Sequence, residues 1–75
     1  MTAKELVKTL MGEKGISNAQ MATALNITQA ALWDRLNPKK TNNMTVLKLN
    51  SMLNQMDCEL IIRDKNSGQE YAVDE

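Results

Sequence analysis

The chain has 75 residues and a hydrophobic fraction of 43%, which predicts one small globular domain and excludes a chain that is disordered throughout. No apolar run is long enough to cross a bilayer, no signal segment opens the chain, and a lone cysteine without any histidine favours neither a disulfide nor a metal cluster, so we expect a cytoplasmic protein with no cofactor or metal. The formal net charge of zero conceals a division, because residues 1–56 hold seven Lys and Arg against three Asp and Glu (+4), and residues 57–75 hold two against six (−4).

Capping boxes open the first two predicted helices. In each box a hydroxyl accepts a backbone amide and a Glu or Gln three residues later reaches back, first with Thr2 and Glu5, then with Ser17 and Gln20. Gly15 stands where the first helix should end. Apolar residues at helical spacing predict the buried stripes, which are Leu6, Val7, Leu10 and Met11 in the first helix and Met21, Ala22 and Leu25 in the second.

A tight junction follows the second helix. Asn26 comes directly after the last apolar residue, and Asn tolerates the left-handed backbone conformation that stops a helix abruptly. Ile27 then fills the corner, while Thr28 caps a third helix that Pro38 ends. We expect its buried side to hold Ala31, Leu32 and Leu36. The opposite side carries Gln29, Ala30, Trp33, Asp34 and Asn37.

The remainder divides into a loop, a helix and a hairpin. The run "NPKKTNNMT" is a polar and basic loop, and Thr45 caps a fourth helix. The apolar face of that helix is predicted to hold Val46, Leu49, Met52, Leu53 and Met56. From Cys58, a small buried hydrophobe, "CELIIRD" and "QEYAV" are strand-like and "KNSG" is a turn. We therefore predict a helical domain over residues 1–57 and a β-hairpin with an acidic tail over residues 58–75.

The third helix has the properties of a reading helix. A helix held at a sharp angle by its predecessor suits the major groove of DNA, which is about 12 Å wide. Gln29 at its start can donate to and accept from adenine in one plane. The free amides at the starts of the second and third helices suit phosphates. The basic charge of residues 1–56 fits a polyanion, although a scatter of solvated surface charge explains it equally well.

Residues 17–37 resemble the helix-turn-helix of the lambda-repressor/Cro-like family of DNA-binding proteins, the family of the xenobiotic-response-element-type transcriptional regulators. The resemblance extends over residues 3–56 and rests on Asn18, Met21, Ala22, Leu25, Ile27, Thr28, Gln29, Leu32 and Leu53. It implies a mainly α-helical, compact bundle of four or five helices that binds operator DNA, usually as a dimer. It also implies that Asn18 and Thr28 touch phosphate and that the base-facing residues are Gln29, Ala30, Trp33 and Asp34.

The phosphate-contacting set continues after the reading face with Arg35, Lys39, Lys40, Thr41 and Asn42. Three side chains keep two interpretations open. Trp33 either meets thymine methyls or sugars, or folds back over the core. Asp34 accepts from a cytosine amino group or, as we favour, pairs with a nearby Lys or Arg. Arg35 contacts phosphate or packs its stem under the helix.

The predicted hairpin is too apolar to be left in water, and two strands alone are marginally stable. It must pack on the helices or pair with a second copy. We predict that it joins two chains in a shared sheet through Leu60, Ile61, Ile62, Arg63, Tyr71 and Val73. Two-fold symmetry then sets the reading helices about 34 Å apart, matching a palindromic site. Some relatives resembling this family carry a similar strand, including antitoxins of toxin–antitoxin pairs.

The sequence therefore predicts a sequence-specific DNA-binding transcriptional regulator of bacterial or phage type. We expect this regulator to act as a nucleoid-associated homodimeric repressor, with residues 28–37 in the major groove of double-stranded DNA. The alternative is an antitoxin or other protein-interaction module whose acidic hairpin binds a partner such as a toxin. An enzyme is not expected, because the chain lacks histidine and the common phosphate-loop, hydrolase and metalloprotease motifs, and is short for a deep substrate cavity.

Overall fold

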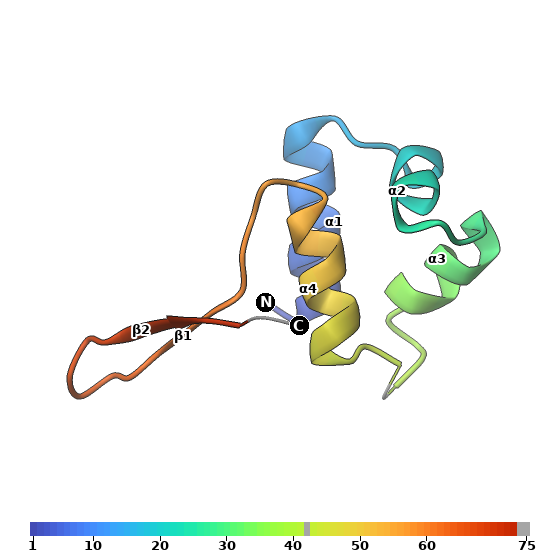
Figure 1. Ribbon diagram of the computed structural model, residues 1–75. Coiled ribbons are helices and arrows are strands. Elements are labelled where there is room, and N and C mark those ends of the chain that lie inside the picture. Colours follow the sequence, from blue (N-terminus) through green and yellow to red (C-terminus); the bar gives the residue numbers. More distant parts are fainter. Residues whose placement is uncertain (42, 74–75) are drawn as a thin grey trace.

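The computed structural model describes residues 1–41 and 43–73, which form a mainly helical fold with a short antiparallel hairpin at its C-terminal end (Figure 1). In chain order the elements are α1 (Ala3–Lys14), α2 (Asn18–Leu25), α3 (Gln29–Leu36), α4 (Val46–Asn54), β1 (Ile61–Arg63) and β2 (Glu70–Ala72). The four described helices fall within the predicted four to five, and the predicted hairpin is confirmed. Among the described helices, none has the length and apolar character needed to cross a membrane.

Each of these helices begins at a hydroxyl cap, as predicted. Thr2, Ser17, Thr28 and Thr45 each accept a hydrogen bond from the backbone amide three residues later, at 3.0 to 3.2 Å. At Ser17 the capping box is complete, because its amide donates to Gln20 Oε1 at 2.8 Å. A cap of this kind is worth about 0.5 to 2 kcal/mol. The starts of the helices are therefore fixed locally.

The junction between α2 and α3 also forms as predicted. Asn26 adopts the left-handed conformation, with φ of 59°, and its amide donates to the Thr23 carbonyl at 3.1 Å. The next amide, that of Ile27, donates to the Ala22 carbonyl at 3.0 Å, and the Ile27 side chain packs half-buried against the core. Thr28 then caps α3 at once, so the chain changes direction within three residues.

An apolar core lies between the helices. α1 and α4 lie side by side, and α2 and α3 pack beside them (Figure 1). The buried apolar residues are Val7, Met11, Met21, Ala22, Leu32, Leu36, Met52, Leu53 and Met56. Four of the six methionines, Met11, Met21, Met52 and Met56, fill space between the short helices, which confirms their prediction as core residues, whereas Met1 is exposed.

Three residues predicted for the core are exposed instead: Ala31, Leu6 and Val46. An α-helix turns about 100° per residue, so Ala31 points well away from the neighbouring buried Leu32. Leu6 is displaced in the same way from the buried Val7. Val46 is 60% exposed because it is the first residue of α4 and lies a full turn before the buried part of that helix.

Asn50 occupies a buried position on α4 that the predicted apolar face did not include. Only 4% of Asn50 is exposed, and its Nδ2 donates to the Val73 carbonyl at 3.1 Å. The bond attaches the end of the hairpin to α4. On the segment that leads from α4 into β1, Leu60 and the half-buried Cys58 pack against the core. The hairpin is thus attached at its base.

The rest of the hairpin projects away from the helices (Figure 1). Its register pairs Ile61 with Ala72, Ile62 with Tyr71 and Arg63 with Glu70. The protein measures 41 × 25 × 23 Å and has a radius of gyration of 13.1 Å, whereas a compact chain of this length has about 11 Å. We predicted that the hairpin packs either on the helices or on a second copy of the chain. It packs on the helices only at its base.

The hairpin turn is organised by Asp64. Its Oδ1 accepts from the amides of Asn66 at 2.9 Å and Ser67 at 3.4 Å, and its carbonyl accepts from the Gly68 amide at 2.8 Å. Gly68 has a φ of 76°, a conformation that glycine adopts without strain. The hydrogen bonds from Asn66 and then Ser67 lower the pKa of the Asp64 carboxyl, because they stabilise its charged form.

We predict that the hairpin turn loosens in acid. The pKa of Asp64 is lower in the folded turn than in the unfolded chain. The contribution of its carboxylate to the stability of the turn is therefore complete above the ordinary Asp pKa and is lost as pH falls through the folded pKa. NMR shifts of the Asn66 and Ser67 amides should titrate together at that lower pH. The Asp64→Asn variant should show no such titration, and a carboxyl titrating at or above the ordinary Asp pKa would contradict the prediction.

Candidate nucleic-acid interface

The face of α3 opposite the core is open to solvent. The predicted base-facing residues Gln29, Ala30, Trp33 and Asp34 are all exposed. Trp33 is 62% exposed, so the interpretation that it covers the core is wrong. The buried Leu32 and Leu36 hold the opposite side of the helix. The helix therefore combines an anchored apolar side with a free polar side.

Two residues define the flanks of this exposed face. Trp33 and Ala31 are two positions apart, which places them about 200° apart around the helix axis, on opposite flanks. Ala30 and Asp34 lie between them on the side away from the core. Each flank borders a hollow, lined by one basic side chain on the Trp33 side and by three on the Ala31 side.

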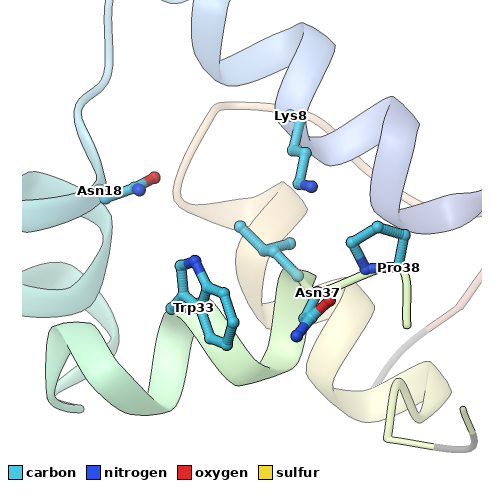
Figure 2. Close-up of a pocket in the computed structure, with 6 residues that line it drawn as sticks. Lys8, Asn18, Trp33, Asn37 and Pro38 are labelled. Carbon is cyan, nitrogen blue, oxygen red and sulfur yellow. The ribbon is translucent and has the colours of Figure 1, made fainter. Parts of the chain in front are cut away.

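The Trp33 flank borders a groove of about 260 Å³ between α3, the start of α2 and α1. Its lining residues are Lys8, Asn18, Trp33, Leu36, Asn37 and Pro38. Figure 2 shows the Lys8 chain descending from α1 and the Asn18 amide extending from the start of α2 toward the space beside the Trp33 ring. The groove thus brings together one cation, amide groups and an apolar surface.

The Ala31 flank borders a more open recess of about 380 Å³. It is lined by Ala31, Asp34, Arg35, Lys40, Asn43 and Lys48. The three basic residues outnumber the single acid. Asn43 Nδ2 donates to the Asp34 carbonyl at 2.6 Å, while Asn43 Oδ1 is buried without a hydrogen-bond partner. The favoured pairing of Asp34 with Lys or Arg is not seen, since no ion pair of residues 1–41 and 43–73 includes it.

The segment after α3 is held by a turn and by a lysine from α1. Asn37 accepts through its carbonyl from the Lys40 amide at 3.1 Å and through Oδ1 from the Lys39 amide at 3.0 Å. The Lys4 ammonium donates to the Asn37 carbonyl at 2.7 Å and to the Lys40 carbonyl at 2.8 Å. Pro38 follows Asn37, whose extended backbone ends α3 as predicted.

Of the predicted phosphate-contacting residues, Asn18 lines the Trp33 groove, and Arg35 and Lys40 line the Ala31 recess. Asn18, Thr28, Lys39, Lys40 and Thr41 are exposed, and Arg35 is half-buried. The Thr28 hydroxyl accepts from the Ala31 amide at 3.0 Å, which leaves its own hydrogen available. Asn42 lies outside the described residues.

Three lysines that the sequence identified only as basic charge occupy separate positions in the structure. Lys8 joins the Trp33 groove, Lys48 joins the Ala31 recess, and Lys4 supports the chain after α3. Lys4 and Lys8 are four residues apart and thus lie on one face of α1. That spacing was a usable signal, but the element opposite them is decided by the packing of α1 on α3.

The predicted dimerisation residues are divided by the hairpin geometry. Leu60 and Val73 are half-buried at its base, whereas Ile61, Ile62, Arg63 and Tyr71 are exposed. Arg63 and Glu70 approach each other at 3.8 Å across the strands. Within the described residues, no group of three His, Cys, Asp or Glu side chains is placed to hold a metal.

Comparisons with protein-family models, curated proteins and solved structures found no match to this chain.

We predict that Lys4→Gln destabilises the protein by about 1 to 2 kcal/mol, because two carbonyls lose a charged donor that is partly shielded from water. Urea unfolding followed by circular dichroism measures this change. Lys8→Gln is the matched control in the same helix and should shift the free energy of unfolding by no more than about 0.5 kcal/mol. Equal stability of the two variants would contradict a structural role for Lys4.

Proposed function

We propose that the protein is a sequence-specific DNA-binding transcriptional regulator of the lambda-repressor-like type, with α3 lying in the major groove. The observation that carries this proposal is the exposed face of α3 between two basic flanks. A helix in the major groove has a phosphate backbone on each side, so a polar face with cations on both flanks matches that environment.

The residues on the exposed face supply suitable chemistry. The Gln29 amide pairs with the N6 and N7 groups of adenine. Ala30 is small enough to let the helix approach the bases closely. Asp34 accepts from the amino group of cytosine, in keeping with its lack of an ion pair among the described residues. Arg35, Lys40 and Lys48 bind the phosphate backbone on the Ala31 side.

The hairpin is proposed to make the protein a dimer. Ile62 and Tyr71 are cross-strand partners and are 61% and 57% exposed, which places two large apolar side chains together on an open face. A second hairpin that adds to this sheet satisfies an exposed strand edge and places its own apolar side chains beside these two. The resulting two-fold symmetry presents two reading helices to a palindromic operator.

Regulation then follows from occupancy. A dimer bound to its operator blocks or repositions RNA polymerase, which makes repression the primary activity of a nucleoid-associated, cytoplasmic protein. We propose no enzymatic activity.

The first prediction of this proposal concerns DNA. A fluorescently labelled random duplex of about 30 base pairs should bind with an affinity that falls steeply with salt, as measured by anisotropy, because phosphate contacts release counterions. On an operator selected from random sequences, Gln29→Ala should weaken binding by about 5- to 150-fold, the value of one bidentate base contact, and leave the random duplex nearly unaffected. Gln69→Ala, on the hairpin, is the matched control. Absence of binding at low salt would refute the proposal.

The second prediction concerns assembly. Ile62→Lys should convert a dimer into a monomer in sedimentation experiments, because two ammonium groups cannot be buried in one apolar interface. Val46→Lys replaces a comparably exposed apolar residue on α4 and should leave the dimer intact. A monomeric wild-type protein, or a dimeric Ile62→Lys variant, would remove the hairpin from this role.

A second candidate function uses the same hairpin. Residues 57–75 hold six acidic and two basic residues, and the exposed Ile62 and Tyr71 lie among them. An acidic segment that exposes apolar side chains fits a basic partner protein, such as the toxin of a toxin–antitoxin pair. Co-purification of a basic protein that dissociates on Ile62→Lys, from a chain that does not bind DNA, would favour this function.

A further inference from the structure

The Trp33 groove contains a lysine that the fold does not use. Lys4, one turn earlier on α1, has its ammonium bound to two carbonyls, whereas no hydrogen bond or ion pair of residues 1–41 and 43–73 includes the Lys8 ammonium. Lys8 is exposed and lies at the edge of the groove opposite the Trp33 ring (Figure 2). Of these two lysines on one face of α1, Lys4 therefore stabilises the fold, and the Lys8 ammonium is left available to a ligand.

The shape and lining of the groove restrict what can occupy it. Its volume of about 260 Å³ is below the range of about 300 to 1,000 Å³ that is usual for small-molecule sites. Asp and Glu are absent from its lining, so it has no acidic ligand for a cation. Its cation lies beside an apolar surface made by Trp33, Leu36 and Pro38. A suitable occupant is a short unit that carries one negative charge next to apolar C–H groups.

A sugar–phosphate unit of DNA has these properties, and the groove is where such a unit would run. Trp33 marks one flank of α3, beside the outward Ala30 and Asp34 rather than among them. When the outward face meets base edges, the flank meets the adjoining backbone strand. The opposite strand then runs past the recess that contains Lys40 and Lys48.

We propose that this groove binds one sugar–phosphate unit of the DNA backbone, with the Lys8 ammonium on the phosphate and the Trp33 ring against the deoxyribose. The inference rests on the proposed DNA-binding function and makes it more specific. It moves Trp33 from the base-facing set implied by the resemblance to the backbone-contacting set. Lys8 and Trp33 then contribute affinity and orientation on any sequence, while Asp34 reads a base from the outward face and Gln29 reads one from the N-terminal end of α3, where it is the first residue of the helix.

The test is the salt dependence of binding to the labelled random duplex of about 30 base pairs. Removing one phosphate contact lowers the slope of log affinity against log salt by about 0.9. Lys8→Gln should show that loss, Lys8→Arg should keep the wild-type slope, and Lys65→Gln should also keep it. Lys65 is the matched control because it lies in the turn of the hairpin, which projects away from the helices (Figure 1), and the substitution removes the same charge. Circular dichroism melting of each variant checks that it is folded.

Trp33 supplies the second arm of the test. Trp33→Leu should weaken binding to the random duplex and to a selected operator by the same factor, because a sugar contact carries no base preference. Trp33 is also the only tryptophan in the chain, so its protection from acrylamide quenching should follow the anisotropy curve.

The outcomes separate this inference from the function on which it rests. If the wild-type protein binds DNA but Lys8→Gln keeps its slope, or Lys65→Gln loses as much, the groove does not hold a phosphate. A loss confined to the selected operator in Trp33→Leu assigns Trp33 to a base and also overturns the inference. If the wild-type protein fails to bind DNA even at low salt, the proposed function itself is wrong.

Discussion

The position of α3 depends on one residue in the left-handed conformation. Asn26 ends α2 with a positive φ, and the amides of Asn26 and Ile27 close the last turn by donating to α2 carbonyls. Thr28 then supplies the cap of α3, so the junction leaves no free length in which the helix could reorient. Ile27 packs into the corner against the core. A different backbone conformation at Asn26 would redirect α3 and both hollows beside it.

Burial converts this local geometry into a fixed surface. Leu32 and Leu36 hold α3 on the core, and Met21 and Met52 fill space between the short helices. A core of this size provides little excess stability, because fully burying an aliphatic or Met side chain contributes only about 1.5 to 3 kcal/mol. The same anchoring leaves Trp33 outside, since its position in the helical turn is away from Leu32.

The charge of the helical part has two physically distinct uses. The Lys4 ammonium donates to the carbonyls of Asn37 and Lys40 in the segment after α3, so its role is structural. The hollows on the two flanks are lined by Lys8, Lys40 and Lys48, whose charges make the electrostatic potential at the exposed face between them more positive. The projecting residues 61–72 carry two basic and two acidic residues, so this part of the hairpin adds no net charge to the field of the helical part.

The local structure was predictable from neighbouring residues: the hydroxyl caps, the left-handed Asn26, the end of α3 before Pro38 and the hairpin with its turn. These features depend on neighbouring residues, so their patterns are legible without the fold. The exposure of Trp33 and Ala31, the burial of Asn50 and the division between Lys4 and Lys8 were decided by tertiary structure. Each of these features depends on which element packs against a given helix face. The spacing of apolar residues along a helix predicts the buried face but does not identify the element that packs on it. The exposed face of α3 was therefore predictable in composition, whereas the hollows on its flanks were not.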